Sequence, residues 1–94
     1  MFGLNDEETI IMEMLGKLEI SQNKNVKFET IQKKLKPKYH DDLKKNIDNL
    51  IAKGLIRPYR VNNYSLTDEG FRIAHALWGK RKEKAYDFRI IRRG

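Results

Sequence analysis

The segment at residues 50–70 constrains the fold most, because it combines the signals of a helix end, a tight hairpin and a new helix start. Gly54 follows a run of apolar residues at helical spacing. A glycine at that place can adopt the left-handed backbone conformation that closes a helix without a Cβ clash. We therefore expect the preceding helix to stop at about Lys53.

The residues that follow predict a hairpin. Apolar side chains within 55–61 indicate a strand, Asn62-Asn63 tolerates the positive φ of a two-residue turn, and 64–66 forms the return strand. Pro58 lacks an N–H, so the first strand should lie at an edge of its sheet. Thr67 has an oxygen that can cap a helix, which places a helix start directly after the hairpin.

Apolar spacing and turn signals divide the rest of the chain into helices and one very short strand. Gly16 lies inside the first helix and indicates a close approach by another helix or a weaker helix end. Lys36-Pro37-Lys38 interrupts the helical pattern, because proline cannot continue a helix. The predicted elements, in chain order, are a helix capped by Asn5 or Asp6, a strand at 26–28, helices at about 29–35 and 39–53, the hairpin, and a helix at about 68–78.

These features resemble the winged helix-turn-helix family, whose common pattern is Lys-Gly-Leu-Ile, a hairpin called the wing, and Tyr-x-Leu-Thr-x-x-Gly. The chain has the first motif at 53–56 and the second at 64–70. The resemblance implies a mainly helical α+β fold over residues 1–79, ordered as helix, short strand, helix, helix, two-stranded wing and helix. It also implies double-stranded DNA binding by a dimeric transcriptional regulator of prokaryotic or archaeal type, with the third helix in the major groove.

Residues 80–94 form a basic C-terminal extension that admits three structures: a disordered arm on DNA, an extended last helix that pairs with its copy, or a terminal strand. Gly79 favours a helix end before the extension, and an alternation of apolar and charged residues follows it. Apolar side chains seek burial, so we favour dimerisation or packing on the body. The candidate dimerisation residues are Trp78, Tyr86, Phe88, Ile90 and Ile91.

The net charge of +7 is unevenly distributed over the 94 residues. Residues 24–60 carry eleven Lys or Arg and four Asp or Glu, a net +7, and residues 80–94 carry seven and two, a net +5. Residues 1–23 carry one Lys and five Asp or Glu, a net −4. This asymmetry favours a polyanionic partner such as nucleic acid, although a well-solvated surface is the alternative.

Length and composition exclude several other classes of protein. Ninety-four residues make one small domain, and the absence of cysteine excludes disulfides and thiolate zinc sites. No apolar run is long enough to span a bilayer and no signal peptide is evident, so we expect a soluble, cytoplasmic protein. His40 lacks further metal ligands at suitable spacing, and His75 should be partly buried beside an apolar stripe. We predict no enzymatic activity, catalytic residue, metal or cofactor.

The third helix is a mixed surface for DNA. Its ridge opposite the apolar face carries Asp41, Lys45 and Asp48, and carboxylates are unfavourable near phosphate. Alternatively, Asp41 and Asp42 stabilise the helix start and pair with its lysines. The candidate DNA contacts, from this helix, the turn before it and the wing, are Lys33, Lys34, Lys38, His40, Lys44, Lys45, Asn49, Arg57, Arg60, Asn62 and Asn63. The competing function is a winged-helix protein-protein interaction module in a larger assembly, which fold resemblance does not separate from DNA binding.

Overall fold

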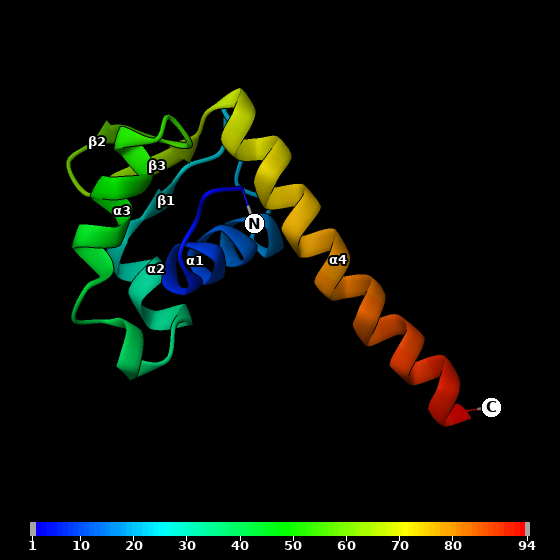
Figure 1. Ribbon diagram of the computed structural model, residues 1–94. Coiled ribbons are helices and arrows are strands. Elements are labelled where there is room, and N and C mark those ends of the chain that lie inside the picture. The colour runs from blue at the N-terminus through cyan, green and yellow to red at the C-terminus, as the bar shows by residue number, and fades with distance from the viewer. Residues whose placement is uncertain (1, 94) are drawn as a thin grey trace.

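The computed structural model describes the backbone of residues 2–93 and the side chains of residues 2–81 (Figure 1). The described residues form a small, mainly helical α+β fold with four α-helices and a three-stranded antiparallel sheet. Its elements are α1 (Asp6–Lys17), β1 (Val26–Lys27), α2 (Phe28–Lys34), the 3-10 helix η1 (Pro37–Tyr39), α3 (Leu43–Ala52), β2 (Ile56–Arg60), β3 (Asn63–Leu66) and α4 (Asp68–Arg93). The predicted order of helices and strands is confirmed, with η1 added between α2 and α3.

The sheet has the order β1-β3-β2, so β3 is central. Val26 lies opposite Tyr64, and Ile56 lies opposite Leu66. All four of these side chains are buried and face the helices. β2 is an edge strand, as the missing N–H of Pro58 predicted.

The hairpin turn lies one residue earlier than predicted. Val61 and Asn62 form it, and Asn62 alone of the pair has a positive φ of 59°. The prediction that Asn63 is a turn residue is wrong, because Asn63 belongs to β3 and pairs with Arg60. A register shift between Pro58 and Arg60 leaves one extra residue in β2, so Arg60 rather than Tyr59 lies opposite Asn63.

The end of α3 and the start of α4 are tied together across the hairpin. Gly54 has a φ of 76°, the left-handed conformation predicted for it. The Thr67 hydroxyl donates to the Gly54 carbonyl at 2.6 Å and accepts from the Gly70 N–H at 3.0 Å, which confirms the predicted cap. A Cβ on Gly70 would overlap the carbonyl oxygen of Leu55. A physical reason therefore exists for each of these three residue types. Gly54 has a left-handed backbone, Thr67 caps α4, and Gly70 leaves no space for a side chain.

α3 begins at Leu43, later than the predicted start at about Tyr39. Pro37 opens η1, where its fixed φ suits the first helical position. Asp42 then has a φ of −102° and a ψ of 12°, which is outside the helical region, so α3 starts only after it. Lys38 and Tyr39 therefore belong to η1 and not to α3.

α4 continues through Gly79, so the predicted helix end at this glycine is wrong. The backbone of residues 80–93 is helical, which contradicts the terminal strand and the disordered arm and agrees with the extended helix. Figure 1 shows that this second half of α4 projects away from the other elements. The side chains of the candidate dimerisation residues Tyr86, Phe88, Ile90 and Ile91 lie outside the described residues. The division into segments 1–79 and 80–94 stays a prediction.

α1 packs closely against the first half of α4. A Cβ on Gly16 would lie 2.5 Å from the Ala74 carbonyl oxygen and 2.9 Å from Cβ of Trp78. This confirms the close helix approach that Gly16 indicated. The buried apolar side chains come from all four α-helices and all three strands and form one core, which includes Ile11, Met12, Leu15, Val26, Ile31, Leu43, Ile47, Leu50, Ile56, Leu66 and Ala74.

Candidate nucleic-acid interface

The face of the sheet away from the helices is basic. Lys27 lies opposite Asn63 on one side and Arg60 lies opposite Asn63 on the other, so the three residues form a row across the strands. Arg57 lies opposite Ser65 in the same sheet. Successive residues of a strand point to opposite faces, and Tyr64, which follows Asn63, is buried in the core. The outer face therefore presents Lys27, Arg57 and Arg60, all of them exposed.

Local contacts hold the two arginines of β2. Nη2 of Arg57 donates to the Gln22 carbonyl oxygen at 3.4 Å. The guanidinium of Arg60 lies 5.2 Å from the ring centroid of Tyr59, a cation–π distance. Both guanidinium groups keep donors directed to solvent, because each is exposed and engages few protein acceptors among the described residues.

The two asparagines of the predicted contact set differ in their surroundings. Asn62 is exposed in the turn. The amide of Asn63 donates to the Val61 carbonyl at 3.1 Å, so one of its two amide hydrogens is used within the hairpin.

A second basic group lies between α2 and α3. Lys33, Lys34, Lys36 and Lys38 are all exposed, and they follow one another from the last turn of α2 through η1. Lysines in the last turn of a helix also interact favourably with the helix dipole. This interaction explains the presence of Lys33 and Lys34 at the end of α2 without any contact to DNA. Nζ of Lys38 lies 5.1 Å from the ring centroid of Tyr39.

The exposed surface of α3 carries an internal ion pair. Nζ of Lys44 lies 2.9 Å from a carboxylate oxygen of Asp48 one turn later. The hydrogen bond to Asp48 raises the pKa of Lys44 above its ordinary value of 10.5. Lysine pairing was predicted as an alternative to DNA contact, but with Asp41 and Asp42; instead Asp48 is the partner. Lys45 is exposed and Asn49 is half-buried on the same helix.

His40 is engaged with the end of α2. Its Nε2 lies 2.9 Å from the Leu35 carbonyl oxygen, and a carbonyl can only accept, so this contact requires the Nε2–H tautomer. The ring is half-buried. His40 therefore helps to hold the turn before α3, and only Nδ1 of its ring remains for a ligand.

Lys27 is a member of the outer-face row that sequence reasoning missed. Its position in a very short strand was predicted, but the pairing of β1 with β3 sets it beside Asn63. That pairing joins residues far apart in the chain. A pattern of alternate burial over two residues is too short to predict it.

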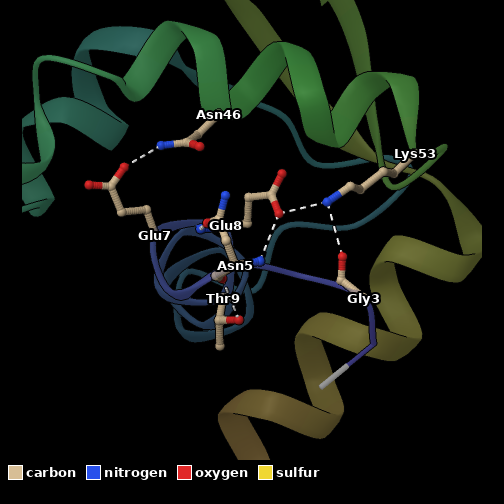
Figure 2. A network of polar contacts seen from close by, with 7 residues as sticks. All are labelled: Gly3, Asn5, Glu7, Glu8, Thr9, Asn46 and Lys53. Carbon is tan, nitrogen blue, oxygen red and sulfur yellow. Dashed lines mark hydrogen bonds and ion pairs between the residues drawn. The ribbon is translucent and has the colours of Figure 1, made fainter.

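A separate polar network joins the start of α1 to α3 (Figure 2). Asn5 caps α1, because its side chain accepts from the Glu8 N–H at 2.7 Å while Glu8 accepts from the Asn5 N–H at 2.9 Å. Nζ of Lys53 donates to the same Glu8 oxygen at 2.7 Å and to the Gly3 carbonyl at 3.0 Å. Asn46 of α3 donates to Glu7 at 2.5 Å. The side chain of Lys53 thus serves to position α1.

Glu8 is a buried carboxylate, with 1% of its side chain exposed. Burial raises its pKa, whereas the hydrogen bonds from Lys53 and Asn5 and the positive charge of Lys53 lower it. The net result is a pKa below the ordinary 4.5. Glu8 is therefore ionised at neutral pH and forms an ion pair with Lys53.

The other candidate residues lie apart from these groups. His75 is exposed, so the predicted partial burial is wrong; its ring contacts that of Phe71, with centroids 4.2 Å apart and planes tilted by 53°. Trp78 is half-buried against α1. Within the described residues, no group of three His, Asp or Glu side chains could hold a metal ion, and no helix is both long and apolar enough to cross a membrane.

No protein-family model, curated protein or solved structure matches the chain.

Proposed function

We propose that this chain binds double-stranded DNA as a winged helix-turn-helix protein, with the hairpin of β2 and β3 as its wing. The observation that carries the proposal is the exposed basic row on the outer face of the sheet, where Lys27 and Arg60 flank Asn63 and Arg57 lies nearby. The order of helices and strands supports the proposal, because it is consistent with a winged-helix layout. The regulatory role, as a dimer that controls transcription, follows only from the family resemblance and is part of the proposal.

Binding would rely mainly on phosphate neutralisation. The outer face of the sheet and the lysines from Lys33 to Lys38 supply cations, and arginine matches the geometry of phosphate oxygens. α3 contributes less, because Lys44 pairs with Asp48 and because Asp41 and Asp42 are exposed near its start. Such an interface would bind many sequences with weak preference.

The direct test is fluorescence anisotropy with a mixed-sequence duplex at several salt concentrations. We expect affinity to fall steeply as salt rises, because binding releases counterions from the phosphates. Arg60→Glu should weaken binding about tenfold and flatten the salt dependence. Arg72→Glu changes the charge equally at an exposed position of α4 and should have a smaller effect. Absence of wild-type binding at low salt would overturn the proposal.

The second candidate, a protein-interaction module, is favoured by apolar exposure at the wing. Tyr59 is 56% exposed and Val61 is 87% exposed. Exposed apolar residues at the tip of a hairpin suit burial against another protein. If anisotropy detects no binding of the duplex, and Arg60→Glu therefore changes nothing, this candidate replaces DNA binding.

The proposed dimer is supported by the shape of α4. Its second half projects away from the body and offers a helical surface to another copy (Figure 1). Sedimentation of the full chain and of a chain truncated after Gly79 tests this. We expect the full chain to be dimeric and the truncated chain monomeric, and an unchanged dimer would contradict the assignment.

A further inference from the structure

A groove of about 440 Å³ lies between α1, α4 and the segment that joins α2 to α3. Its volume is within the range of small-molecule sites in proteins. Every residue that lines it belongs to the part of the chain whose side chains the structure describes. The groove is on neither the outer face of the sheet nor the wing.

The floor of the groove is apolar. Ile10 and Met14 of α1, Leu35 after α2, Tyr39 of η1 and Trp78 of α4 line it. Except for Leu35, these side chains are only half-buried, so a concave apolar surface with two aromatic rings remains open to solvent. Burial of such a surface against an apolar ligand is favourable in proportion to the area covered.

The rim of the groove is cationic. Lys17, Lys34, Lys36 and Arg81 surround the floor, and all four are exposed. Nζ of Lys17 lies 5.8 Å from the ring centroid of Trp78, so this ammonium group stands beside an aromatic part of the floor.

Glu13 is the single carboxylate in the lining, and Arg81 Nη1 lies 4.0 Å from it. Four cations against one carboxylate leave a net positive rim. An anionic group at the rim would lower the repulsion among these cations, and an apolar body attached to it would cover the floor.

We propose that this groove binds an amphipathic organic anion, specifically a carboxylate attached to an aromatic body. The aromatic body lies on Tyr39 and Trp78, and the carboxylate accepts hydrogen bonds from Lys34 and Lys36. The basic tail of a second copy is a poorer occupant, because residues 80–94 carry a net charge of +5 and would meet a rim of the same sign. The groove lies apart from the outer face of the sheet, although Lys34 and Lys36 belong both to its rim and to the lysines proposed to contact DNA.

Trp78 is the only tryptophan of the chain, so fluorescence excited selectively at tryptophan reports on a side chain that lines this groove. The experiment titrates the full-length protein with 4-phenylbutyrate, with the neutral 4-phenylbutanamide and with acetate, in the absence of DNA. We expect a saturable change of Trp78 emission with 4-phenylbutyrate and a dissociation constant on the order of 0.1 to 1 mM, as for other ligands of this size. The amide should bind at least fivefold more weakly, and acetate should cause no change.

Two variants test the rim and the floor separately. Lys36→Gln removes one exposed cation and should weaken 4-phenylbutyrate binding about threefold to tenfold, whereas Lys24→Gln, an exposed lysine outside the groove, should leave it unchanged. Met14→Glu places a carboxylate in the apolar floor and should abolish binding; its thermal unfolding shows whether it is folded. If Met14→Glu does not fold, Lys36→Gln remains decisive.

Three results would overturn the proposal. The first is equal affinity for the amide and the carboxylate, which would mean that the rim cations play no part. The second is wild-type affinity in Lys36→Gln. The third is a change of Trp78 emission with protein concentration but not with 4-phenylbutyrate, which would mean that a second copy occupies the groove. None of these results depends on whether the protein binds DNA.

Discussion

Two sides of α1 carry the same kinds of side chain in opposite surroundings. On the side that faces α3, Glu8 is buried and receives hydrogen bonds from Asn5 and Lys53. On the side that faces the groove, Glu13 lies 4.0 Å from an exposed arginine, and the apolar side chains around it are half-buried. The comparison shows that α1 is held by hydrogen bonds and an ion pair on the side that faces α3, while its other side contributes to an open groove of ligand size.

The largest effect is expected from Lys53→Met, which removes the cation from the closed side. Glu8 would remain buried without its partner, and an uncompensated buried charge costs several kcal/mol. Because the Lys53 side chain is 40% exposed, we expect a smaller loss, about 2 kcal/mol of unfolding free energy at pH 7. Urea unfolding measures it. Lys45→Met on the same helix is the control, and an equal loss in both variants would contradict the role of Lys53.

The same pair should set a pH dependence. The pKa of Glu8 is lowered in the folded protein, so its contribution is fully present above the ordinary value of 4.5 and is lost as the pH falls through the folded pKa. In Lys53→Met burial remains and raises that pKa, so stability is lost as the pH rises. The difference in unfolding free energy between the two proteins should therefore shrink from pH 7 towards pH 4. A constant difference would show that Glu8 does not titrate as its contacts require.

A smaller effect is expected where α1 meets α4 beside the groove. Gly16→Ala places a methyl group 2.5 Å from the Ala74 carbonyl oxygen, so the helices must separate. We expect a loss of about 1 to 2 kcal/mol, since overpacking outweighs the gain in helix propensity. Gly79→Ala is the matched control, because nothing lies within 4 Å of its added Cβ, and it should gain up to about 1 kcal/mol. Equal changes measured by thermal unfolding would contradict the close packing.

The smallest effect is expected on the open side. Glu13→Gln breaks a long ion pair to an exposed arginine, and such pairs contribute little, so unfolding free energy should change by less than about 0.5 kcal/mol. The same variant makes the rim more positive, so binding of 4-phenylbutyrate should tighten about twofold. If Glu13→Gln lowers the unfolding free energy as much as Lys53→Met does, the proposed difference between the α3-facing side and the groove-facing side of α1 is wrong.

The sequence predicted which types of residue form the candidate nucleic-acid interface, but it did not predict how they are arranged. Exposed lysines and arginines were expected to contact DNA, and Arg57, Arg60 and the lysines after α2 are exposed. Their arrangement was not predictable, because Lys27 joins them through strand pairing. His40 was expected to be free for bases, but its ring contacts the Leu35 carbonyl, a consequence of the extra turn at η1.

The sequence by itself determined the features that depend on neighbouring residues. The left-handed Gly54, the cap at Thr67 and the break at Pro37 follow from the local chemistry of the backbone, so the order of helices and strands was predictable. Gly79 was misread because one glycine costs a helix only about 1 kcal/mol, which the helix-forming residues after it can offset.

Only the tertiary structure decided which charges are buried, where the hairpin turns and which surface stays open to solvent. The burial of Glu8 depends on Lys53, the register of Asn63 depends on a bulge in β2, and the groove needs three segments brought together. These features arise from contacts between residues distant in the chain. Their energies depend on packing and on the exclusion of water, which no local pattern of residues encodes.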